Sequence, residues 1–102
     1  HEAGHALGLG HDGVSGGSAY YTGHGSGQTS WAPIMGVGYS RNVTQWSRGE
    51  YANANNREDD LQVMQSYGLG YRTDDHGNTL SAASYLPVGT ALYAEGLIER
   101  NT

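Results

Sequence analysis

The chain has 102 residues, the size of one small domain or of part of a larger one. Ten acidic residues against five basic ones give a net charge of −5, which excludes a basic surface for nucleic acid or for an anionic membrane. The sequence contains no Cys, so a metal site in it must use His, Asp or Glu. No apolar run approaches the roughly 18 to 20 residues of a membrane span.

The first predicted element is a helix over residues 1–8, because HEAGHALG combines Ala and Leu with pairs of residues four apart. Gly8 and Gly10 are able to adopt the positive φ that ends a helix. Residues 12–33 are dense in Gly, Ser, Thr and Tyr and have no regular period, which predicts a long irregular loop. Because Tyr20 and its aromatic neighbours argue against disorder, we expect this loop to form a wall of a substrate site.

A second helix is predicted over residues 57–67. Asn56 is its expected N-cap, and the acidic residues that follow favour the N-terminal end of a helix dipole. Apolar residues then recur at helical spacing as far as Tyr67, and Gly68 occupies the position of a left-handed C-terminal cap.

The first residues of the chain carry a metal-binding pattern. His1 and His5 lie four apart, so on a helix both imidazoles face the same way and can bind one Zn²⁺ with Glu2 beside it. A catalytic zinc uses three protein ligands and a water, so a third ligand is needed beyond the helix. Gly8 allows the backbone to reverse, which lets His11 approach the metal from another side. The full pattern, H-E-x-x-H-x-x-G-x-x-H, predicts a zinc site.

The run HEAGHALGLGHD resembles the zinc-binding motif of the metzincin metallopeptidases, and Asp12 is similar to the residue that closes it in the reprolysin branch. The run APIMG, residues 32–36, resembles the turn that places a Met beneath the zinc in metzincins, which makes Met35 the candidate. Residues 58–68 are similar to the acidic-capped helix that ends in Tyr-Gly in matrixins and serralysins. Since the chain has no Cys, the resemblance favours a bacterial reprolysin-like or matrixin-like relative.

This resemblance implies an α+β fold. Residues 1–71 would be the C-terminal subdomain of a metzincin catalytic domain, with a zinc helix, a long irregular loop containing the Met-turn, and a C-terminal helix. The sheet subdomain, whose edge pairs with an extended substrate, would lie upstream of the zinc helix. We therefore expect the chain on its own to be inactive.

The function implied by the resemblance is that of a secreted zinc metalloendopeptidase acting on polypeptides. His1, His5 and His11 would hold the zinc, and Glu2 would be the general base that activates a zinc-bound water. Gly8 and Met35 would serve the structure of the site. Neither the sequence nor the resemblance indicates an oligomeric state.

A non-catalytic binding or adhesion module that keeps zinc for structure is the alternative. Structural zinc sites are closed by four protein ligands, so a fourth ligand from Asp12 or His24 would favour this alternative, whereas an open fourth position favours catalysis. A solvated loop histidine is the more common case for a residue such as His24.

Residues 72–102 are predicted to be a linker and the start of a β-rich accessory domain. They resemble the opening of a bacterial pre-peptidase C-terminal domain, a small β-sandwich, and residues 91–100 predict short strands. Asp74, Asp75 and Asn78 could offer oxygen ligands to Ca²⁺. Their spacing does not match an EF-hand loop, so a plain turn is the favoured interpretation.

Overall fold

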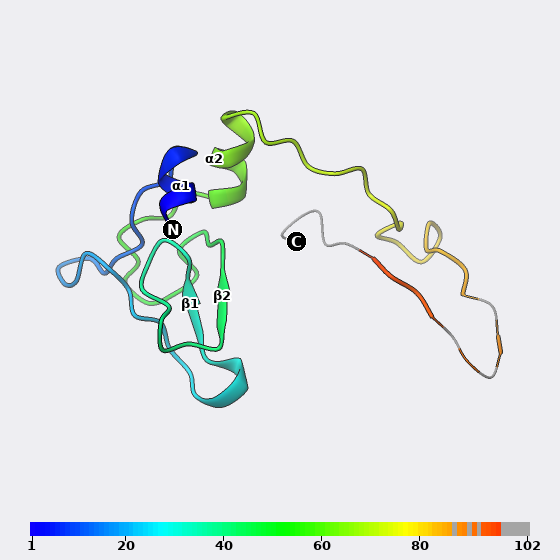
Figure 1. Ribbon diagram of the computed structural model, residues 1–102, viewed down its shortest axis with the longest axis horizontal. Coiled ribbons are helices and arrows are strands. Elements are labelled where there is room, and N and C mark those ends of the chain that lie inside the picture. The colour runs from blue at the N-terminus through cyan, green and yellow to red at the C-terminus, as the bar shows by residue number, and fades with distance from the viewer. Residues whose placement is uncertain (87, 90, 92, 97–102) are drawn as a thin grey trace. The chain divides into compact units, whose positions relative to one another are not determined.

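The computed structural model describes residues 1–86, 88, 89, 91 and 93–96. The chain divides into two units, His1–Leu69 and Gly70–Thr102. The described helices and strands all lie in the first unit (Figure 1), in the order α1 (Glu2–Ala6), η1 (Gly27–Thr29), β1 (Trp31–Pro33), β2 (Val43–Gln45) and α2 (Asp60–Ser66). This is a small mixed unit of two α-helices and a two-stranded parallel sheet, compatible with the expected α+β class. No helix in the described ranges is long and apolar enough to cross a membrane.

Helix α1 is shorter than the predicted range 1–8 because its C-terminal cap starts earlier. The amide of Gly8 donates to the carbonyl of His5, and the amide of Leu9 donates to the carbonyl of Gly4, each at 3.0 Å. With Gly8 at a φ of +87°, these two bonds make a Schellman cap. Gly10, the other glycine expected to be able to end this helix, is not in the left-handed region. The chain reverses at Gly8 and leads from α1 directly to the third histidine of the motif.

The segment 12–33 is more regular than the predicted loop. It contains η1 and ends in β1, whose Trp31 pairs with Val43 of β2 in a parallel register. Figure 1 shows the two strands side by side. The connection 34–42 is short for a parallel pair, which ordinarily needs about a dozen residues or more. Sequence reasoning missed β1 because a three-residue strand is too short to display a period of two.

Side-chain hydrogen bonds order the irregular part of this segment. The guanidinium of Arg41 donates to the carbonyls of Thr22, Gly25 and Gly23, at 2.8, 3.0 and 3.2 Å respectively. One guanidinium therefore binds three backbone carbonyls that have no partner in a helix or a sheet. An irregular segment must find such partners for its backbone polar groups in order to fold.

Helix α2 starts later than predicted, and the expected N-cap is wrong. Asp59 has an extended backbone and its side chain accepts a hydrogen bond from the amide of Gln62, so Asp59 is the cap. The carboxamide oxygen of Asn56 instead accepts from the amide of Glu58 at 3.0 Å, which forms a separate turn before the helix. The predicted C-terminal cap is confirmed, because Gly68 has a φ of +99°.

The apolar core of the first unit is small and lies where α1, α2 and the turn after β1 meet. Its buried centre is formed by Leu9, Met35 and Met64. Five partly buried side chains surround that centre: Leu7, Ile34, Trp46, Leu61 and Val63. Because Leu9 and Met35 come from segments next to the histidines, packing of this core also determines where His1, His5 and His11 lie.

In the described residues of the second unit, the backbone forms turns and bends, with no helix or strand. The strands predicted for residues 91–100 do not occur at 91 or 93–96, and positions 92 and 97–100 lie outside the described residues. Large apolar side chains of this unit, such as Leu80 and Tyr85, are exposed. The described part of the unit therefore contributes no buried core of its own.

Candidate metal centre

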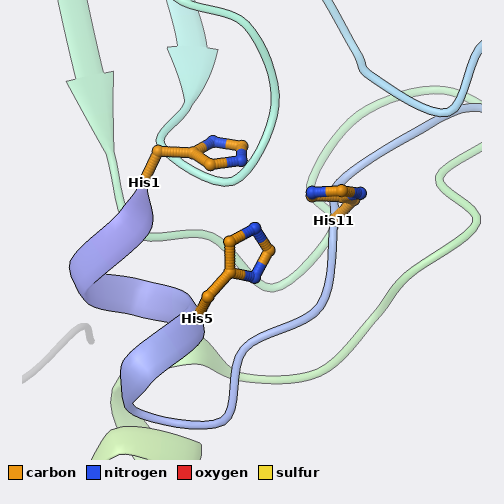
Figure 2. Close-up of side chains that lie close together, drawn as sticks. All are labelled: His1, His5 and His11. Carbon is orange, nitrogen blue, oxygen red and sulfur yellow. The ribbon is translucent and has the colours of Figure 1, made fainter.

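Three imidazole rings converge at the start of the chain. His1 is the N-cap residue of α1 and His5 lies in its last turn, and His11 extends from the loop that follows the Gly8 cap (Figure 2). The ring centroids lie 4.9 Å apart for His1 and His5, 5.3 Å for His1 and His11, and 4.7 Å for His5 and His11. One nitrogen of each ring lies within 4.8 Å of a nitrogen of the other two. In the described part of the chain this is the one group of three or more acidic or His side chains arranged to hold a metal ion.

Two of the three rings are oriented by backbone carbonyls. The Nδ1 atom of His1 lies 2.9 Å from the carbonyl oxygen of Ile34, and Nδ1 of His5 lies 2.9 Å from that of Leu9. A carbonyl oxygen only accepts, so each Nδ1 must carry the proton and donate it. The lone pair of each neutral ring is then on Nε2, the tautomer in which a histidine binds metal through Nε2. The donor set therefore fits Zn²⁺, which binds neutral imidazole and accepts three-histidine sites.

The residue after the third histidine has a structural role. Asp12 is buried, and its Oδ2 accepts a hydrogen bond of 2.8 Å from the Ser47 hydroxyl. Its amide donates to the carbonyl of Met35 at 3.0 Å. Burial raises the pKa of Asp12, and the hydrogen bond from Ser47 opposes that rise. Because the Asp12 carboxylate is held by Ser47, it is not part of the metal-binding group.

Ser47 also joins the loop after His11 to helix α2. Its amide donates to Oδ2 of Asp60 at 2.8 Å, so one serine links two buried carboxyl groups. Oδ1 of Asp60 is buried with no hydrogen-bond partner among the described residues. Burial is the main reason that the pKa of Asp60 rises to about 7. Sequence reasoning missed this link, since it interpreted Asp60 only as an acidic residue at a helix N-terminus.

Met35 packs against helix α1 at Gly4. Pro33 to Gly36 form a turn in which the amide of Gly36 donates to the carbonyl of Pro33 at 3.1 Å. The Met35 side chain is fully buried, and a Cβ built on Gly4 of α1 would lie 2.5 Å from its sulfur. Gly4 therefore permits the close approach of α1 to this turn.

Glu2 is exposed on α1 and borders an open pocket of about 600 Å³ beside His1. Other parts of the pocket wall are formed by Val37, Gly38 and Thr44, from the connection after Met35 and from β2. A carboxylate next to a candidate metal ligand at the edge of a pocket of this size is placed to contact a bound molecule.

The remaining candidate ligands lie outside the metal-binding group. Nδ1 of His24 lies 2.9 Å from the hydroxyl of Tyr21, and the backbone of His24 pairs with Trp31. In the second unit, Asp74 accepts hydrogen bonds from the amide of His76 at 3.3 Å and from Nδ2 of Asn78 at 2.6 Å. These bonds are those of an Asx-type turn, which agrees with the favoured interpretation of that segment.

Comparisons with known protein families, with curated proteins and with solved structures find no match to this chain. The assignment of a function therefore depends on the geometry and the chemistry of the residues described above.

Proposed function

We propose that this chain is the metal-binding part of a zinc-dependent metalloendopeptidase of the metzincin type, which hydrolyses peptide bonds in secreted or extracellular polypeptides. The observation that carries the proposal is the convergence of His1, His5 and His11 with Glu2 at the edge of the same site. The resemblance of residues 1–12 and 32–36 to the metzincin motifs supports it.

The division of labour among the residues follows from their chemistry. Zn²⁺ held by three imidazoles would lower the pKa of a coordinated water and polarise a substrate carbonyl. The carbonyls of Ile34 and Leu9 keep the protons of His1 and His5 on Nδ1, so that both Nε2 lone pairs remain available.

Glu2 would act as the general base of the reaction. Its carboxylate would accept a proton from the attacking water and deliver it to the leaving nitrogen. A carbon–oxygen bond then forms at the peptide carbonyl while the carbon–nitrogen bond breaks, and the products are a carboxylate and an amine. The pocket beside Glu2 would hold a side chain of the substrate next to the scissile bond.

The donor set also bears on the alternative, a zinc-stabilised binding or adhesion module. Such a module would require a fourth protein ligand to close the site. Asp12 is held by Ser47 and His24 by Tyr21, and among the described residues the group that could hold a metal has three members. Three ligands leave the fourth position to water or substrate, which favours the peptidase proposal.

Hydrolysis of an unstructured polypeptide by the longest natural chain that contains this sequence tests the proposal. The zinc-loaded parent is compared with Glu2→Gln, which keeps the size of the side chain but cannot accept a proton. Glu50→Gln is the matched control, because the Glu50 carboxylate binds Arg48 in a surface ion pair. We expect a chelator to abolish hydrolysis, Glu2→Gln to lower kcat at least about a hundredfold at unchanged zinc content, and Glu50→Gln to have little effect.

A folded, zinc-loaded parent that cleaves no polypeptide would refute the peptidase proposal. Equal rates for the parent and Glu2→Gln would refute the role of Glu2 as the general base.

A further inference from the structure

The third histidine of the metal-binding group differs from the other two in what orients its ring. His1 and His5 donate Nδ1–H to backbone carbonyls. The His11 ring makes no hydrogen bond within the part of the chain that the structure describes, so its described neighbours are ring contacts. The aromatic ring of Tyr20 lies against it, with centroids 4.5 Å apart and an angle of 47° between the ring planes. The same ring lies 6.3 Å from that of His1.

Backbone hydrogen bonds determine where Tyr20 lies relative to His11. Tyr21 follows Tyr20 in the sequence and Asp12 follows His11. The amide of Tyr21 donates to the carbonyl of Asp12 at 2.7 Å. The carbonyl of Tyr21 in turn accepts from the amide of Val37 at 2.9 Å, which connects this pair to the segment after Met35. The two rings are therefore brought together by short contacts of the main chain.

The side chain of Tyr21, the residue after Tyr20, is also held in place. The ring of Tyr21 stacks on that of Tyr51, with centroids 4.0 Å apart and planes within 4° of parallel. Tyr51 is buried, and its hydroxyl donates to the carbonyl of Gly13 at 2.8 Å. These contacts attach the loop to the rest of the first unit at Tyr21, the residue after Tyr20. They therefore limit where the Tyr20 ring can lie.

We propose that Tyr20 is the positioning residue of the third metal ligand: its ring packs on the imidazole of His11 and replaces the Nδ1 hydrogen bond that orients His1 and His5. This inference rests on the proposed zinc site, although not on the proposed peptidase activity. Groups that orient metal-binding histidines typically contribute 10- to 100-fold in metal affinity. A contact between two rings contributes about as much as one hydrogen bond, and we expect an effect near the lower end of this range, about tenfold.

Metal affinity and the spectrum of a bound Co²⁺ ion test the proposal. The longest natural chain that contains this sequence is used, as in the hydrolysis test. Zn²⁺ affinity is measured by competition with a chromophoric chelator, and the visible absorption of the Co²⁺-loaded chain reports the geometry of its ligands. Three variants are compared with the parent: Tyr20→Ala, Tyr20→Phe and Tyr71→Ala.

The expected pattern separates the ring of Tyr20 from its hydroxyl. Tyr20→Ala binds Zn²⁺ about tenfold more weakly than the parent and has altered Co²⁺ bands, whereas Tyr20→Phe keeps the ring and restores both properties. Tyr71 is the matched control, since it has the same exposed fraction as Tyr20, 39%, and belongs to the second unit of the chain. Tyr71→Ala is expected to leave the affinity and the spectrum unchanged.

Two results would overturn the proposal. If Tyr20→Ala has the affinity and spectrum of the parent, the ring does not position His11. If Tyr20→Phe binds Zn²⁺ about tenfold more weakly than the parent, the hydroxyl and not the ring is responsible, and this comparison with the parent holds whether or not Tyr20→Ala folds. Hydrolysis enters neither measurement, so a chain with the expected metal binding and no peptidase activity would refute the proposed function and leave the role of Tyr20 standing.

Discussion

The contact between α1 and the turn that holds Met35 makes a quantitative prediction about Gly4. A Cβ added at Gly4 would lie 2.5 Å from Sδ of Met35, 3.2 Å from Cδ1 of Leu9 and 3.2 Å from Cζ3 of Trp46. Favourable separations between such atoms are about 3.5 to 4.0 Å. Met35 and Leu9 are buried in the core, so neither can move aside into solvent.

Two opposing effects decide the stability of Gly4→Ala. Ala is favoured over Gly inside a helix by about 1 kcal/mol, while an extra methyl group in a packed core costs about 1 to 3 kcal/mol. Three different side chains surround the added methyl, and the shortest contact is about 1 Å below a favourable separation. The packing cost is therefore near the upper end of its range, and we expect Gly4→Ala to lower the free energy of unfolding by about 1 to 2 kcal/mol.

A double-mutant cycle identifies the contact responsible. Met35→Val removes the sulfur and costs stability by itself, about 2 kcal/mol, but it makes room for a methyl group at position 4. In that background the helix propensity of Ala prevails, so Gly4→Ala should become neutral or stabilising. The coupling energy between the two changes should then be about 1 to 3 kcal/mol.

Urea denaturation followed by tryptophan fluorescence measures all four chains, and Trp46 is a suitable reporter because it lies against the altered contact. All four chains are compared at the same free Zn²⁺ concentration, because under the proposed zinc binding the ion would stabilise the folded state. The reasoning is wrong if Gly4→Ala is more stable than the parent. It is also wrong if Gly4→Ala costs the same with Val at position 35, because Met35 is then not the obstructing side chain.

Two further predictions concern Asp60 and Gly8. The pKa of Asp60 is about 7 in the folded chain against an ordinary 3.8, so folding favours the protonated carboxyl. The free energy of unfolding should therefore be highest below about pH 4 and should fall as the pH rises to 7, by at most about 4 kcal/mol. Asp60→Asn should remove this part of the pH dependence in urea denaturation at pH 4 to 8 with chelator present, and parallel curves for the parent and the variant would contradict it. Gly8 and Gly68 have φ values of +87° and +99°, so Ala at Gly68 should cost about 1 to 2 kcal/mol of unfolding free energy. Ala at Gly8 should cost at least as much, because its Cβ would also meet the exposed ring of Tyr67. Only Gly8→Ala should also weaken Zn²⁺ binding in the chelator competition, because the chain from Gly8 leads to His11, and an equal loss of affinity in Gly68→Ala would refute that distinction.

Sequence reasoning succeeded for features that depend on a few neighbouring residues. The spacing of His1 and His5 places both rings on one side of a helix, since residues four apart share a face. Gly8 and Gly68 each mark a helix end, because a positive φ at a C-terminal cap is a local demand that Gly meets at least cost.

Boundaries were less predictable because several local interactions compete for them. Both Asn56 and Asp59 are good N-cap residues, and the sequence does not indicate which one the chain uses. The choice depends on Asp60, which is buried and accepts a hydrogen bond from the amide of Ser47. That contact places the first turn of α2, and with Asn56 already bonded to Glu58 the cap falls to Asp59.

The sequence by itself determined which residue types are available to a metal: three histidines at fixed spacing and an acidic neighbour. Tertiary structure alone decided how those rings are held. The carbonyl that orients His1 belongs to Ile34, and the ring against His11 belongs to Tyr20, in a segment with no regular period. Hydrogen bonds and ring contacts between separate segments form only after the chain has closed the loops that bring them together, so no local pattern in the sequence encodes them.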